Sequence, residues 1–95
     1  MKTPGGYQIL DLTGVTINAE AAVTFADAKK AEILRSNDKL LVITGASLGA
    51  TTVTAITGDV TDTGARDGKV YHFTVNGNGY TITTNDANIT ITPAV

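Results

Sequence analysis

Residues 45–49 have the spacing of a hydrolase nucleophile. Gly45-Ala46-Ser47-Leu48-Gly49 fits the G-x-S-x-G pattern after an apolar run, where a sharp strand-to-helix turn would expose the serine hydroxyl. An acid and a histidine follow the serine in the order of such enzymes, from Asp59, Asp62 or Asp67 to His72. The pattern needs a helix directly after the serine, but the next residues are A-T-T-V-T, which favour a strand. We therefore interpret residues 45–49 as a glycine-bounded loop and expect His72 to face solvent.

A second segment has the sequence of a protease motif. Asp62-Thr63-Gly64-Ala65 resembles the D-T-G-A motif of retroviral-type aspartic proteases, whose small monomers dimerise and pair two carboxylates. Such a pair works because two adjacent carboxylates share one proton, which raises the pKa of one of them. Here the motif runs into a charged loop, and the segment after it is short. We expect no enzymatic activity and keep a dimeric protease that uses Asp62 as an alternative.

The same aspartates raise the question of a metal site. Asp59, Asp62 and Asp67 could supply oxygen ligands to calcium, but their spacing does not match the EF-hand pattern and Arg66 lies among them. The chain has no cysteine and a single histidine, so thiolate sites and histidine clusters are excluded. We interpret the aspartates as a solvated acidic turn and expect no metal and no cofactor.

Composition limits the class of protein. The chain has 95 residues, of which 42% are hydrophobic and only 17% charged, and its formal net charge is -2. This balance predicts one folded domain over residues 1–95, with residues 1–6 as a lead-in. Nucleic-acid binding needs a clustered basic surface, which this chain lacks. No apolar run approaches the roughly 20 residues of a membrane span, and no signal-peptide core is visible, so we expect synthesis in the cytoplasm and no membrane partner.

The positions of apolar residues predict one helix among strands. The expected elements are a strand at Tyr7–Leu12, extended after a bend by Val15 and Ile17, a helix at Thr24–Ser36, a central strand at Leu40–Ile43, a strand at Thr51–Thr57 and a polar loop at Gly58–Gly68. Thr24 and Asp27 have capping-box spacing, which places the helix start at Thr24. The uninterrupted apolar run at residues 40–43 suits a strand covered on both faces, one of them by the helix.

The last third of the chain predicts a hairpin followed by one more strand. Strands at Val70–Asn76 and Tyr80–Thr84 flank a Gly/Asn turn, and Asn88–Thr92 follows after a second turn. With Asn76-Gly77 as the turn Phe73 faces Tyr80, whereas with Gly77-Asn78 Phe73 faces Ile82; both registers keep the apolar residues on one face. In total we expect an α+β domain of about six mainly antiparallel strands with one helix packed on the sheet.

The positions between these apolar residues carry threonine. Thr81, Thr83, Thr90 and Thr92 alternate with isoleucines, which predicts a polar but uncharged outer face. Removing such a face from water costs less free energy than removing a charged one. A domain of this composition is typical of proteins that act through their surface.

The order of segments resembles the small globular modules of tailed-phage head fibre and capsid decoration proteins. The resemblance lies in Tyr7–Gly14, a short helix, Lys39–Gly45 and the Tyr-x-Phe strand at residues 71–73. It implies a structural virion protein, a homotrimer seated on the major capsid or another virion protein, made in the cytoplasm of a bacterial host and located on the virion surface. The chain has no coiled-coil or collagen-like shaft, which favours a compact decoration protein. A secreted or surface adhesion module is the other non-enzymatic alternative.

Overall fold

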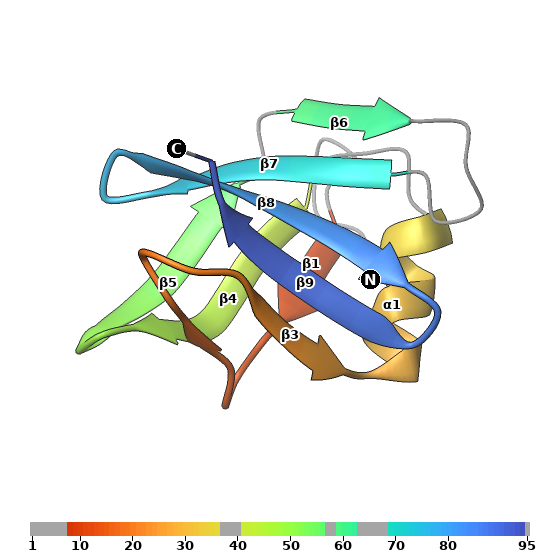
Figure 1. The fold of residues 1–95 in the computed structure, drawn as a ribbon, viewed down its shortest axis with the longest axis horizontal. Helices are drawn as coiled ribbons and strands as arrows, with labels where there is room; N and C mark the ends of the chain where they lie inside the picture. The colour runs from red at the N-terminus through yellow and green to blue at the C-terminus, as the bar shows by residue number, and fades with distance from the viewer. Residues whose placement is uncertain (1–7, 37–40, 57–58, 63–68, 95) are drawn as a thin grey trace.

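The computed structural model describes residues 8–36, 41–56, 59–62 and 69–94 as a small β-rich domain (Figure 1). Within these ranges it has nine strands and one helix, in mostly antiparallel sheets, so the α+β class is confirmed in outline. The strands are β1 (Gln8–Asp11), β2 (Thr16–Ile17), β3 (Val23–Ala26), β4 (Leu41–Leu48), β5 (Thr51–Ile56), β6 (Asp59–Asp62), β7 (Lys69–Val75), β8 (Asn78–Asn85) and β9 (Asn88–Pro93), and the helix is α1 (Ala28–Ser36). The expected six strands were too few, because β3 was expected within the helix, β6 within a loop and β2 as an extension of the first strand.

The first sheet is built around β4. β1 and β2 both run parallel to β4 along one side, and β5 pairs antiparallel on the other. Between β1 and β2 the Leu12 amide donates to the Thr44 carbonyl and the Ser47 amide to the Val15 carbonyl. β1 and β2 are therefore one strand interrupted near Gly14, and the predicted extension after a bend is confirmed.

The predicted loop at residues 45–49 is wrong. β4 continues through it to Leu48, and its register with β5 shifts between Thr44 and Ser47, which marks a β-bulge. Gly45 adopts a φ of 84° at this bulge, a conformation that glycine reaches without strain. Because the bulge accommodates Gly45 within β4, the strand continues past it, and only Gly49 and Ala50 form the turn to β5.

The second sheet has the strand order β3-β9-β8-β7-β6, antiparallel throughout. Phe73 faces Tyr80 and Tyr71 faces Ile82, so the hairpin uses the Asn76-Gly77 turn. Asn76 and Gly77 have φ values of 52° and 83°, the pair of positive angles that a two-residue type I′ turn requires.

The helix begins four residues later than predicted. Thr24 lies in β3, where it pairs with Thr90 of β9, and α1 starts at Ala28. Asp27 caps the helix: its Oδ1 accepts from the Lys30 amide at 3.1 Å, and its carbonyl accepts from the Ala31 amide at 2.9 Å. Pairing with β9 outweighs the capping-box spacing because each residue of β3 gains a strand partner there.

The predicted polar loop at Gly58–Gly68 is also wrong in its first half. Asp59–Asp62 forms β6, an edge strand beside β7, in which Val60 pairs with Tyr71 and packs against the core. Residues 63–68 lie outside the described part of the chain. One apolar residue facing a buried tyrosine is enough to hold a short edge strand.

The core lies between the two sheets, with α1 closing one end (Figure 1). Its large side chains include Leu10, Leu12, Ile43, Tyr71, Phe73, Tyr80, Ile82, Ile89 and Ile91. The helix contacts β8 and β9, where Ala31 and Leu34 are buried, and makes no comparable contact with β4, one face of which it was predicted to cover. On the outer face of β4, Val42 is half-buried and its register neighbour Ile9 is 41% exposed. The first sheet therefore buries apolar side chains mainly on its inner face, which faces the second sheet.

Candidate functional site

The outer face of the second sheet is a threonine surface. Along β8 and β9 the inward residues Tyr80, Ile82, Ile89 and Ile91 are buried, and the residues between them point outward. We call the outward threonines of three adjacent strands the threonine face: Thr24 of β3, Thr90 and Thr92 of β9, and Thr81 and Thr83 of β8. Thr24 is exposed and the other four are half-buried.

Register aligns the threonine face into rows across the sheet. Thr24 pairs with Thr90, which pairs with Thr83, while Thr81 pairs with Thr92. The Oγ1 atoms of Thr24 and Thr90 lie 2.9 Å apart and share a hydrogen bond. Each hydroxyl can donate once and accept twice, so the rows keep unused hydrogen-bonding capacity toward solvent.

The threonine face has no charged side chain. The alternate positions that point outward on β3, β7, β8 and β9 carry no Asp, Glu, Lys or Arg, and His72 of β7 is the one titratable residue among them. His72 is half-buried and its Cα partner on β8 is Thr81. This arrangement suits contact with another surface, because an uncharged face of hydroxyl and methyl groups loses little free energy when it leaves water.

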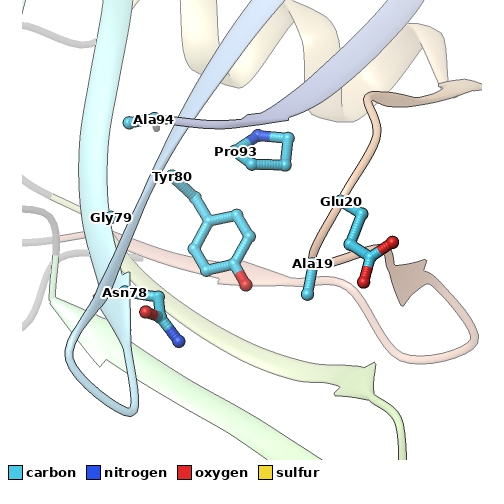
Figure 2. A pocket seen from close by; sticks show the side chains of 7 residues that line it. All are labelled: Ala19, Glu20, Asn78, Gly79, Tyr80, Pro93 and Ala94. Atoms are coloured by element: carbon cyan, nitrogen blue, oxygen red, sulfur yellow. The ribbon is translucent and has the colours of Figure 1, made fainter.

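A pocket of about 290 Å³ opens at one end of the sandwich (Figure 2). One wall is the loop between β2 and β3, and the other is formed by the start of β8 and the end of β9. Its described lining residues are Ala19, Glu20, Asn78, Gly79, Tyr80, Pro93 and Ala94. Two hydrogen bonds hold the loop in shape, because Asn18 Oδ1 accepts from the amides of Glu20 at 2.7 Å and Ala21 at 3.1 Å.

The G-x-S-x-G hypothesis fails on geometry. Ser47 lies on β4 with Thr16 and Thr52 as register neighbours, in the first sheet. His72 is on the outer side of the second sheet, so the hydrophobic core separates the two. In register, His72 lies between Asp59 of β6 and Thr81 of β8, so the hydroxyl residue beside it is Thr81 and not Ser47.

The aspartates of the protease and calcium hypotheses are only partly described. Asp62 is the last residue of β6 and pairs with Lys69, while Thr63–Ala65 and Asp67 lie outside the described residues. Within the part of the chain that the structure does describe, no three acidic, histidine or cysteine side chains gather as metal ligands would.

Two aspartates hold local structure: Asp27, which was expected within a capping box that starts at Thr24, and Asp11, which was not expected to have such a role. Hydrogen bonds to Asp11 Oδ1 from the Thr13 hydroxyl at 2.6 Å and the Thr13 amide at 2.9 Å keep the pKa of Asp11 below its usual value. Hydrogen bonds from the amide and ammonium of Lys30 lower the pKa of Asp27 in the same way, and the ammonium lies 3.0 Å from Oδ2. The spacing Asp-x-Thr-Gly at residues 11–14 was a signal for this turn.

Comparisons with known proteins give no relative. No protein-family model, no curated protein and no solved structure matches the chain significantly. Across residues 8–36, 41–56, 59–62 and 69–94 the structure contains no helix of the length and apolar character that a membrane span requires. The geometry of the surfaces is therefore the basis for a functional proposal.

Proposed function

We propose that the protein is a non-enzymatic structural component of a phage-like particle, which self-associates and docks onto the capsid through the threonine face. The observation that carries this proposal is the uncharged, register-aligned row of hydroxyls formed by Thr24, Thr90 and Thr83. A face of this kind has the composition of a contact surface.

The energetics of the threonine face favour contact. A threonine presents a methyl group, which gains from burial, and a hydroxyl, which needs only one partner to avoid a desolvation cost. A lysine or glutamate at the same position would resist burial far more strongly because a charge is costly to remove from water. Branched Cβ atoms also keep the side chains in few rotamers, so ordering them at a contact costs little entropy.

The resemblance to capsid decoration modules supports the particle and the trimer. The segments that carry it correspond to β1, α1, β4 and β7. Decoration proteins of that type sit on symmetric positions of a capsid, commonly as trimers. A homotrimer on a major capsid protein, exposed on the virion surface, is the arrangement that we propose.

A single charge on the threonine face tests the proposal. Thr83→Lys places an ammonium on the face beside Thr90, and Thr54→Lys places one at an exposed position on β5 of the other sheet as a matched control. We expect light scattering to show loss of the oligomer for Thr83→Lys and not for Thr54→Lys, with both variants folded by circular dichroism. An oligomer that Thr83→Lys leaves intact would contradict the assignment of the face.

A further inference from the structure

We propose that the pocket between the β2–β3 loop and the β8–β9 end binds a neutral pyranose unit of a carbohydrate. The pocket lies apart from the threonine face, and the proposal holds or fails independently of assembly. Figure 2 shows the side chains of Tyr80, Pro93 and Glu20 around this space.

Tyr80 marks the pocket as a binding site. The residue is 1% exposed, and its ring stacks on Phe73 with 5.5 Å between centroids. No described residue hydrogen-bonds to its hydroxyl, yet that oxygen is not among the buried unsatisfied atoms, so it must contact the pocket surface. In Figure 2 the hydroxyl points into the gap between Asn78 and Ala19. A nearly buried tyrosine normally pairs its hydroxyl within the protein, whereas here the hydroxyl is left for water or a ligand in the pocket.

The polar groups of the pocket select the ligand class. The Tyr80 hydroxyl donates and accepts, the Asn78 amide donates and accepts, and the Glu20 carboxylate accepts. A ligand with several hydroxyl groups satisfies this mixture, because each hydroxyl can also donate and accept. Glu20 is the one charged residue among the described lining, so phosphates and carboxylates are disfavoured.

The apolar groups and the size agree with a sugar ring. Pro93 offers a flat ring surface, and Ala19 and Ala94 offer methyl groups, which match the C–H face of a pyranose. A volume of about 290 Å³ is at the small end for ligand sites, and fits a single ring better than an extended peptide. The fixed shape of the loop, held by Asn18, reduces the ordering cost of binding.

The test is a titration followed by nuclear magnetic resonance. The probes are the methyl pyranosides of glucose, galactose and mannose, added to the intact protein. We expect at least one of them to cause saturable shifts of the Glu20, Gly79, Tyr80 and Ala94 amides. Tyr80→Phe removes only the hydroxyl and should weaken that binding about tenfold, the loss of one hydrogen bond. Tyr71→Phe is the matched control, because the Tyr71 hydroxyl is bonded inside the core and should not affect affinity.

Three results would overturn the proposal. The first is the absence of shifts at these amides with every pyranoside, and the second is unchanged affinity in Tyr80→Phe. The third is tighter binding of methylammonium than of any pyranoside, lost in Glu20→Gln, which would assign the pocket to a cation. Threonine-face variants leave the pocket intact, so failure here is distinguishable from failure of the proposed assembly.

Discussion

The two buried tyrosines differ in what their hydroxyls do. The Tyr71 hydroxyl donates to the Leu34 carbonyl at 2.7 Å, in the last turn of α1, whereas the Tyr80 hydroxyl faces the pocket. Tyr71→Phe should therefore lower the free energy of unfolding by about 1–3 kcal/mol, since a buried helix carbonyl loses its donor. Tyr80→Phe should change stability little. Urea unfolding of both variants measures this, and equal losses would contradict the assigned roles.

Gly45 is required by its neighbours as well as by its backbone. Its φ is 84°, and a Cβ there would overlap the Thr13 hydroxyl that Asp11 holds in place. Gly45→Ala should cost about 2 kcal/mol or more in the free energy of unfolding. Gly14→Ala is the control, because Gly14 has a φ of 92° but open space around its Cβ position, and should cost only about 1–2 kcal/mol. If thermal unfolding shows the same loss for both, the close approach at Gly45 is unimportant.

At the scale of elements, the start of α1 depends on one carboxylate. The pKa of Asp27 is lowered from 3.8 by hydrogen bonds from Lys30, so its charge stabilises the fold above pH 3.8. That contribution is lost as pH falls through the lowered value. Asp27→Asn keeps a capping oxygen without the charge. It should melt at a lower temperature than the wild type at neutral pH and at the same temperature in strong acid.

Circular dichroism melts of both proteins across this range measure the effect. A constant difference between wild type and Asp27→Asn at all pH values would mean that the charge does not matter. Glu32→Gln, at an exposed position of α1, is a control for a simple loss of negative charge.

The sequence predicted best those elements whose conformation is set by residues close together in the chain. Asn76-Gly77 is a turn because both residues take positive φ, and alternation over residues 70–92 identifies three strands without other information. Thr24 was assigned wrongly because its spacing to Asp27 also fits a helix cap, and only pairing with β9 makes Thr24 to Ala26 a strand. The bulge at Gly45 and the edge strand β6 depend equally on distant partners.

The candidate sites divide in the same way. Four members of the threonine face were predictable, because Thr81, Thr83, Thr90 and Thr92 alternate with buried residues on hydrogen-bonded strands. Thr24 joined them through a strand that was expected to be a helix. The pocket was not predictable, since Glu20 and Tyr80 come together only when the β2–β3 loop lies beside the start of β8.

At the scale of the whole molecule, the outer faces of the two sheets and the pocket belong to one small β-rich domain. The helix covers the inner side of β8 and β9, so the threonine face on their outer side stays open in the described fold (Figure 1). An open, uncharged sheet face has little protection against association, and the proposed assembly would form through this face.

The proposed assembly through the threonine face is tested most directly by the solution mass of the wild-type protein. Light scattering measures this mass over a wide range of concentration. We predict a stable species of three times the 9.8 kDa chain mass. A monomer at every concentration would contradict assembly through the threonine face, and a dimer would contradict the trimer and call for a peptide-cleavage assay of Asp62→Asn at acid pH.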